Sequence, residues 1–329
     1  MELTALIYVE GEWNPSLFCQ NKEERIPIYE IPAEKMENTF STKDAGKTQK
    51  PAQRKEWLGN RMRDTLEAGG LKPEEVLLIA ATDVSAQAAG QLGLAVAGYV
   101  NPCFPGQSFP GVPMVIEGFE EVDLEFLDRI YRRCHGLPWT IAVTDRCLLR
   151  EMTVDDLDDL ICLYEQPGIT WRETGNGKRV PGFIEPLFPR EEEKSYQEAY
   201  ISNMYGYYGY GMWAVIHRKT GKLIGRAGLE HREYASGVEL ELGYLIHPHF
   251  QHRGIATEVC NAILTFAGEN LDFPRINALT DPQNHASAAL LGKLGFVYLE
   301  DTFVTGSRMQ RYIRNLNLLR GESKVLSDR

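Results

Sequence analysis

The sequence predicts two α/β domains in one chain: a domain built on a parallel sheet, followed by an α+β domain built on a mixed sheet. Three observations support this fold class. The chain has 329 residues, which is longer than one typical domain. In its first half, apolar runs of strand length alternate with helical patterns, as in parallel sheets. In its second half, a hairpin precedes a long apolar strand that leads directly into a helix.

The N-terminal domain is expected to span residues 1–145 and to alternate strands with helices. Short apolar runs predict the strands, and helical periodicity predicts the helices. A polar, lysine-rich segment at residues 36–55 is expected to be a solvated loop. The predicted strands are residues 3–9, 76–81, 94–99 and 113–116, and the predicted helices are residues 54–68, 85–92 and 123–134.

The C-terminal domain is expected to span residues 146–316, with a tail at 317–329. Thr153-Val-Asp-Asp156 predicts a helix start, because carboxylates are favourable in the first turn of a helix. Residues 165–189 are rich in Pro and Gly and predict a long loop. The Tyr- and Gly-rich tract at 205–211 either packs against the sheet or forms a wall of the substrate site. Further predicted strands are 147–149, 213–217, 223–229, 238–246, 277–280 and 308–313, and further predicted helices are 191–203 and 286–294.

The stretch from residue 239 to residue 258 organises the C-terminal domain. Its apolar strand ends at His247-Pro248, because proline cannot donate to a sheet, and helical spacing begins at Ile255. The first amides of a helix lack internal partners and carry partial positive charge, so a helix start suits a phosphate. Gly254 has no Cβ to keep the backbone away from an anion. Taken alone, a glycine between a strand and a helix is also a common connection.

Four short motifs surround this helix start. They are Glu241-Leu-Gly-Tyr244, Gln251-x-x-Gly254-x-Ala256, Asn284-x-x-Ser287 and Lys293-Leu-Gly-Phe296. In this order and at this spacing, they resemble the acetyl-CoA-binding core of the GNAT superfamily of N-acetyltransferases, over residues 148–313. The resemblance is greatest to the branch that includes acetyltransferases of ribosomal-protein N-termini.

This resemblance implies an enzyme that moves an acetyl group from acetyl-CoA to a primary amine, by direct attack in a ternary complex. The acceptor would be a protein N-terminus or a small amine. The alternative is an acyl-CoA-binding or protein-interaction module whose catalysis has lapsed. Acetyl-CoA is expected as a cosubstrate, without a metal. The histidines of His247-x-His249-x-x-His252 are expected at the surface or the cleft edge, because the segment turns from strand to loop.

The resemblance also implies where the cofactor binds. The amides of the loop would hold the pyrophosphate, and the end of the strand would hold the pantetheine arm. Asn284 and Ser287 would lie near that arm, and Asn284 is also a candidate helix N-cap. The implied cofactor-binding residues are Leu245, Ile246, His247, Gln251, His252, Arg253, Gly254, Ile255, Ala256, Asn284 and Ser287.

Glu241 is the implied general base. Glu239 lies two residues earlier, so it points to the same face of the strand. Either carboxylate could act directly or through a water molecule. The alternative is that one of them pairs with a basic side chain such as Arg226 or Arg232.

The general acid is not assigned by the motifs. Many members of the superfamily have a tyrosine at the position of Leu291 in this chain. A tyrosine of the tract at 205–210, Tyr244 or water could take its place, and coenzyme A could also leave as the thiolate.

The N-terminal half resembles the haloacid-dehalogenase-like (HAD-like) hydrolase fold, which is Rossmann-like, without its cap. The matching stretches are residues 5–11, 72–79 and 88–90. That family phosphorylates an aspartate just after the first strand, and Val9 and Gly11 stand at its two aspartate positions. Neither can serve as nucleophile or acid, so we expect a scaffold without phosphatase chemistry. The nearby acidic residues, which are candidate metal ligands or solvated surface, are Glu10, Glu12 and Asp83.

The composition disfavours some classes of binding partner and indicates the cellular compartment. The net charge of −11 disfavours nucleic acid and anionic membranes, and mildly favours cationic substrates. No apolar run approaches the roughly 20 residues of a membrane helix, and the N-terminus lacks a signal pattern. A homodimer is left open. Cysteines without a CxxC pair predict reduced thiols in a cytoplasm. They are Cys19, Cys103, Cys134, Cys147, Cys162 and Cys260.

Overall fold

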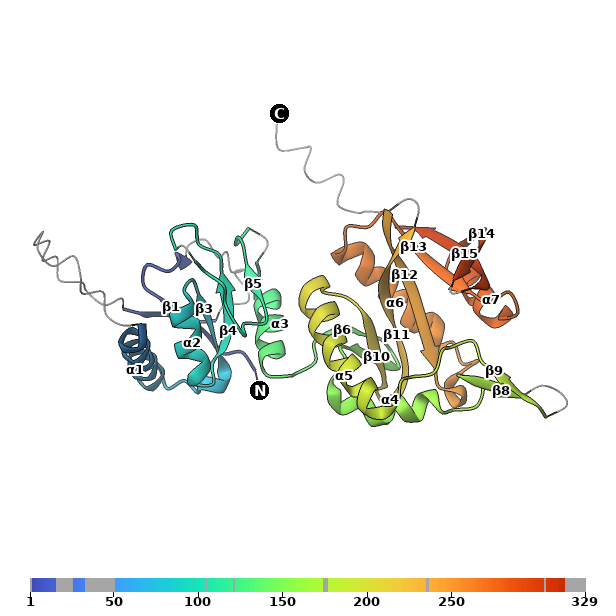
Figure 1. The fold of residues 1–329 in the computed structure, drawn as a ribbon, viewed down its shortest axis with the longest axis horizontal. Coiled ribbons are helices and arrows are strands. Elements are labelled where there is room, and N and C mark those ends of the chain that lie inside the picture. Colours follow the sequence, from blue (N-terminus) through green and yellow to red (C-terminus); the bar gives the residue numbers. More distant parts are fainter. Residues whose placement is uncertain are drawn as a thin grey trace, which may run out of the picture. The chain divides into compact units, whose positions relative to one another are not determined.

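A computed structural model describes most of the chain, and Figure 1 shows its elements. The described residues are 2–15, 26–32, 51–104, 106–120, 122–173, 177–234, 237–304 and 306–316. The tail predicted at 317–329, and most of the loop predicted at 36–55, lie outside them. Within the described ranges, no helix has both the length and the apolar character needed to cross a bilayer.

The chain divides into two compact units between Leu137 and Pro138. The boundary predicted after residue 145 therefore moves toward the N-terminus. The reason is strand β6, Thr140–Val143, which pairs with β7 in the sheet of the second unit.

The first unit contains a five-stranded sheet in the order β2-β1-β3-β4-β5, and every neighbouring pair is parallel. The predicted parallel sheet is thus confirmed. Strand β2 was not predicted, because it is short and its side chains are mostly half-exposed. The strands are β1 Ala5–Val9, β2 Ile28–Ile31, β3 Val76–Ala80, β4 Ala95–Tyr99 and β5 Val115–Ile116. The helices are α1 Pro51–Gly69, α2 Asp83–Gln91 and α3 Leu124–Cys134, with a 3-10 turn at Pro73–Glu75.

Helices cover both faces of this sheet, which explains why β1 is apolar along its whole length. Alternate side chains of β1 enter two different cores. Ile7 packs in the core that contains Met62 of α1 and residues of α2. Leu6 packs in the core that contains Leu127 and Tyr131 of α3. The first residues of α1 belong to the segment expected as a loop, so that loop ends earlier than predicted.

The second unit contains an eight-stranded sheet in the order β14-β15-β13-β12-β11-β10-β7-β6. Only β12 and β13 run parallel, so the sheet is mixed as predicted. A two-stranded hairpin, β8 Trp171–Glu173 and β9 Arg179–Pro181, lies outside it. The other strands are β7 Cys147–Arg150, β10 Met212–His217, β11 Leu223–Tyr234, β12 Gly237–Ile246, β13 Arg275–Thr280, β14 Val297–Val304 and β15 Ser307–Asn315.

The parallel pair β12 and β13 positions the site. Although both strands are described in full, they pair only at Leu240 with Ile276 and at Glu241 with Asn277. Antiparallel pairing with β11 continues along all of β12, up to Ile246. The second half of β12 therefore has a backbone edge that faces away from β11 and carries no strand.

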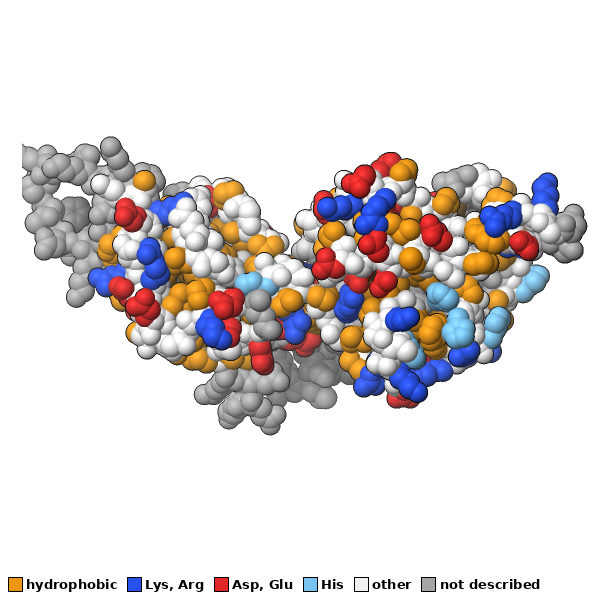
Figure 2. Space-filling view, turned by 90° about the horizontal axis from the view of Figure 1, so that it is seen from below, with side chains coloured by type: hydrophobic (Ala, Val, Ile, Leu, Met, Phe, Trp, Pro, Cys, Tyr) orange, Lys and Arg blue, Asp and Glu red, His pale blue; other side chains and the backbone are white. Residues whose placement is uncertain are grey.

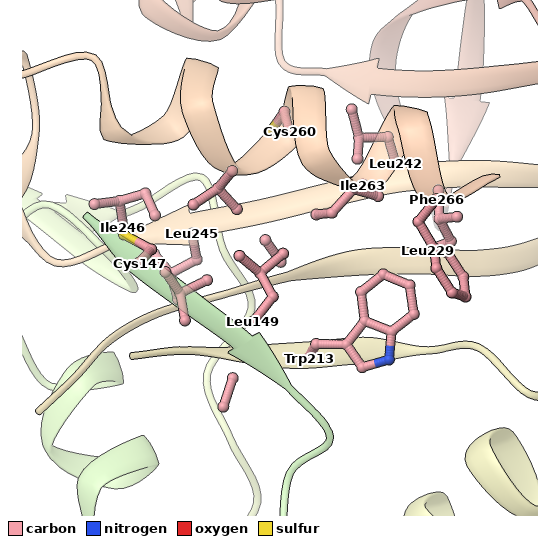
Figure 3. Packing of buried hydrophobic residues seen from close by; sticks show 14 of the residues in the cluster. Cys147, Leu149, Trp213, Leu229, Leu242, Leu245, Ile246, Cys260, Ile263 and Phe266 are labelled. Carbon is pink, nitrogen blue, oxygen red and sulfur yellow. The ribbon is translucent and has the colours of Figure 1, made fainter. Parts of the chain in front are cut away.

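The described residues of the second unit also form four helices. The ring of Trp213, in β10, packs edge to face on the ring of Phe266, in α6, with the ring centroids 5.2 Å apart. Figure 3 shows this core between α6 and the sheet. The helix predicted to end near residue 203 instead continues as a π-helical turn, Ile201–Tyr208, through the Tyr- and Gly-rich tract. The helices are α4 Leu157–Tyr164, α5 Arg190–Tyr200, α6 Ile255–Asn270 and α7 His285–Lys293, with 3-10 turns at Val154–Asp156 and Pro248–Phe250.

A hairpin and a strand of the second unit were not predicted. The loop predicted at 165–189 contains the β8–β9 hairpin. Strand β14 was missed, because most of its side chains are exposed on both faces and leave no alternating pattern.

Candidate functional site

A cavity of about 660 Å³ opens where β12 separates from β13. It is bounded by β12, by the start of α6, by the start of α7, and by the segments that flank the β8–β9 hairpin. Of the predicted cofactor-binding residues, those that line it are Leu245, Ile246, Gln251, His252, Gly254, Ile255, Ala256, Asn284 and Ser287.

The two remaining cofactor predictions lie elsewhere. His247 lines a second cavity of about 480 Å³ on the side of α4. Arg253 has an exposed side chain, and its carbonyl accepts a hydrogen bond from Arg146 Nη1 at 2.7 Å.

The loop before α6 turns sharply to present the helix start. His252 and Gly254 are both left-handed, with φ of 57° and 76°. Gly254 is the N-cap of α6, and a helix start leaves its first amides without internal partners. Gln251 Nε2 donates to the Ile246 carbonyl at 2.8 Å, which fastens the loop to the end of β12. The arrangement offers positive polarity to an anion in the cavity.

An ion pair between Arg146 and Glu258 links this loop to the first turn of α6 and forms a brace. The Arg146 amide donates to Glu258 Oε1 at 2.8 Å, and its guanidinium donates to Glu258 Oε2 at 2.6 Å. Burial opposes ionisation, but hydrogen bonds from Thr144 and Arg146 hold the pKa of Glu258 below its ordinary value. Sequence reasoning missed this brace, because the two residues are 112 positions apart.

Asn284, Ser287 and Tyr244 also line the cavity. Asn284 Oδ1 accepts from the Ser287 amide at 3.1 Å, so its predicted role as N-cap of α7 is confirmed. The hydroxyls of Ser287 and Tyr244 are 2.7 Å apart. Burial raises the pKa of Tyr244 to about 12, although Ser287 opposes this shift. Tyr244 therefore keeps its proton at neutral pH.

The other candidate acids are less well placed. Leu291 is fully buried in the core. Tyr205 donates to the Met212 carbonyl at 2.5 Å, and Tyr207 is 82% exposed. None of the tyrosines at 205–210 is among the described residues that line the cavity. Tyr244 is the one candidate acid named from the sequence that reaches it.

Glu239 is enclosed by a polar network. Its carboxylate accepts hydrogen bonds from Arg275 Nε at 2.7 Å, Asn277 Nδ2 at 2.7 Å and Arg311 Nη2 at 3.3 Å. It is 7% exposed. This is the ion pairing that the alternative reading expected, with Arg275 and Arg311 as partners.

Glu241 is also paired. Arg232 Nε donates to Glu241 Oε2, Arg232 Nη2 donates to Oε1 at 3.3 Å, and the Tyr234 hydroxyl donates to Oε2 at 3.2 Å. Neither glutamate is among the described residues that line the cavity. A proton or a water molecule must therefore compete with Arg232 for the Glu241 carboxylate.

Figure 2 shows several histidines on one face of the second unit. Three histidine rings lie near Phe250: the centroids of His217, His247 and His249 lie 5.1, 6.0 and 5.3 Å from the Phe250 centroid. Burial, followed by the nearby His249, lowers the pKa of His247. Among the described residues, no group of three or more His, Cys, Asp or Glu side chains is arranged to hold a metal ion.

In the first unit, Glu12 lies between the ends of β1 and β3. It was expected at the surface if it bound no metal, but it is only 2% exposed. Its carboxylate accepts from the Ala81 amide at 2.8 Å, the Thr82 hydroxyl at 2.7 Å and the Ser85 hydroxyl at 2.8 Å. These groups open α2, whose N-terminus favours a negative charge. Burial raises the pKa of Glu12 in opposition to the three hydrogen bonds.

Three further positions of the first unit, one acidic and two at the aspartate positions of the HAD-like family, have structural roles. Asp83 accepts from the Ser108 hydroxyl at 2.7 Å and from the Phe109 amide at 2.9 Å, and Ser108 is the main cause of its lowered pKa. Val9 ends β1 and is buried, whereas Gly11 turns the chain with a φ of 81°. These contacts hold loops together.

Comparison with known proteins places the second unit in a family. Residues 146–297 match the Acetyltransferase (GNAT) domain, so the C-terminal half contains a GNAT acetyltransferase domain. The uncharacterized protein YkkB of Bacillus subtilis (strain 168) is 26% identical over 160 residues, which are 48% of this chain and 86% of YkkB. The uncharacterized N-acetyltransferase YoaA of the same organism is 28% identical over 156 residues, 47% of this chain and 82% of YoaA. The acetyltransferase structure from Agrobacterium tumefaciens str. C58 is 24% identical with a TM-score of 0.42, and covers 54% of this chain and 94% of its own.

Proposed function

We propose that the GNAT acetyltransferase domain of this chain transfers an acetyl group from acetyl-CoA to a primary amine, by direct attack within a ternary complex. The observation that carries the proposal is the 660 Å³ cavity. It brings together the open edge of β12, the start of α6 and the Asn284–Ser287 turn, which the sequence resemblance assigned to one cofactor.

The residues of the cavity suit a nucleotide thioester. Amides of the loop at 251–256 would hold the pyrophosphate, because they lie at a helix start that attracts anions. At the unpaired edge of β12, the Ile246 amide would bond to a carbonyl of the pantetheine arm, whereas the Ile246 carbonyl already accepts a hydrogen bond from Gln251. The Ser287 hydroxyl would contact the arm near the thioester.

Tyr244 is the proposed acid. As the amine nitrogen bonds to the acetyl carbon and the C–S bond breaks, negative charge develops on the sulfur. With a pKa raised to about 12, the Tyr244 hydroxyl stays protonated and can donate a hydrogen bond to that sulfur. Ser287, 2.7 Å away, fixes its orientation.

The pairing of the glutamates bears on the acceptor. Glu239 has a structural role in this proposal, whereas Glu241 acts as base through water once that water displaces Arg232. At pH 7 an α-amino group is neutral in roughly one molecule in ten, and a lysine side chain in roughly one in 2,500. An α-amine needs little help from such a restrained base, so we propose an α-amine as acceptor.

We further propose that the first unit is a degenerate HAD-like domain without phosphatase chemistry. Its parallel sheet and the end of β1 at Val9 support this reading. The Glu12 carboxylate is hydrogen-bonded at the carboxyl ends of β1 and β3, which is where a parallel sheet ordinarily binds its ligand.

Two measurements on the full chain test the proposal. Isothermal titration measures acetyl-CoA binding, and a free-thiol assay measures release of coenzyme A with a panel of amines. We expect binding, together with thiol release that depends on the amine and falls in Glu241→Gln. Tight binding without amine-dependent thiol release would instead support a module with lapsed catalysis.

A further inference from the structure

Arg226 of β11 is a buried cation that has no acidic partner among the residues that the structure describes. It is 8% exposed, and its Nε has no hydrogen-bond partner. Its Nη1 donates to the Tyr164 hydroxyl at 3.5 Å, and its guanidinium carbon lies 5.2 Å from the centre of the Tyr200 ring. Among the described residues, no carboxylate forms an ion pair with it.

The groups around Arg226 do not neutralise it. A guanidinium stays charged in proteins, and an unpaired buried charge is unfavourable. Burial, then the charge of Glu230, raises the pKa of Tyr200, so this phenol is neutral at physiological pH. The Glu230 carboxylate accepts a hydrogen bond from the Tyr200 hydroxyl at 2.9 Å, and the Glu193 carboxylate accepts one from Gln197 Nε2 at 2.6 Å. These carboxylates are engaged with other donors.

Arg226 is one strand away from the 660 Å³ cavity and is not among the described residues that line it. In the antiparallel pair of β11 and β12, its partner is Leu245, which lines the 660 Å³ cavity. Paired residues place their side chains on the same face of a sheet, about 5 Å apart at Cβ. Tyr164 ends α4, and the chain reaches the cavity wall again at Gly168 and Ile169.

We propose that Arg226 binds a carboxylate of the acyl acceptor, so that the preferred acceptors are amines that also carry a carboxylate. The planar guanidinium matches a carboxylate with two parallel hydrogen bonds, and Tyr164 adds a further donor. The inference rests on the proposed function. It replaces the mild preference for cationic acceptors expected from the net charge, because a buried local charge outweighs a screened distant field.

The experiment compares matched acceptors. Thiol release is measured with α-amino acids of different side chains, with β-alanine, and with the carboxamide of each. The variant is Arg226→Met, which keeps apolar volume, and the control is Arg308→Met, which removes an exposed arginine paired with Asp301. Titration with acetyl-CoA shows that both variants are folded and load the cosubstrate.

We expect the wild type to prefer the acid of at least one pair by about 30-fold or more in kcat/KM, as for loss of a buried charge pair. Arg226→Met should lose that preference, mainly through KM, so that its kcat/KM values for the acid and the carboxamide become equal. Arg308→Met should behave as wild type. Equal use of acids and carboxamides by the wild type, or an equal loss of both in Arg226→Met, overturns the inference.

A binding arm separates this inference from the proposed function. Calorimetry measures N-acetyl amino acids against their carboxamides, in the presence of coenzyme A. Wild-type binding of the acids alone, without any amine-dependent thiol release, would refute the transferase and leave the carboxylate site intact. Binding of neither ligand, or of both equally, refutes the site. If Arg226→Met does not fold, the wild-type comparison decides.

Discussion

Replacing Gly254 with alanine tests the helix-start site most directly. Gly254 has a φ of 76°, where an L side chain costs roughly 1–2 kcal/mol. The new methyl would meet only Arg146 Nη2, at 3.6 Å, so a steric clash is not the cause. If the loop relaxes to relieve this strain, its amides turn away from the pyrophosphate position. Returning them to that position when acetyl-CoA binds then costs the same free energy as the strain. The dissociation constant for acetyl-CoA should therefore rise by about 5- to 30-fold.

The matched control is Gly268→Ala, in the same helix. Gly268 has open space at its Cβ position, so alanine there should raise the free energy of unfolding by up to about 1 kcal/mol. Its affinity for acetyl-CoA should not change. Isothermal titration gives the affinities, and urea denaturation followed by tryptophan fluorescence gives the stabilities. A folded Gly254→Ala protein that binds acetyl-CoA as tightly as the wild type would refute the reasoning.

Three other predictions follow from the contacts described. Tyr244→Phe should lower kcat by about 10- to 100-fold and leave acetyl-CoA affinity nearly unchanged, because the acid is lost and the ring remains; an unaltered kcat in stopped-flow thiol release would exclude Tyr244 as the acid. Glu258→Gln should weaken the brace on Arg146 by about 1 kcal/mol. Because the folded pKa of Glu258 is depressed, its contribution is present above the unfolded pKa and is lost as pH falls through the folded value. Denaturation at a series of pH values should show this loss in the wild type and not in the variant. Glu12→Ala should destabilise the first unit by about 2–3 kcal/mol, since buried donors lose their acceptor, and should leave the affinity for acetyl-CoA unchanged. An unchanged free energy of unfolding would show that the three hydrogen bonds contribute little.

Local sequence patterns predicted the parts of the site that lie close together in the chain. The strand, the turn at Gly254 and the helix after it are contiguous, so apolar spacing and one glycine were sufficient. The N-cap of α7 was equally local, because Asn284 and Ser287 are three residues apart.

The contacts that the sequence did not reveal join distant segments. Arg146 meets Glu258, and Glu12 meets Ser85 across 73 positions, and no local pattern marks either pair. Arg226 looked like an ordinary basic partner for a glutamate, but the register of β11 and β12 sets it opposite Leu245. Which charges are neutralised depends on packing of α4 and α5, which a single sequence does not encode locally.

The early separation of β12 from β13 leaves the larger sheet unfinished. Amides of alternate residues in the second half of β12 point toward a gap where a neighbouring strand would ordinarily lie. A linear ligand with its own amide groups can fill that gap and act as a short substitute strand. In its absence, deuterium should enter these positions faster than the amides that face β11, and the bound ligand should slow that exchange.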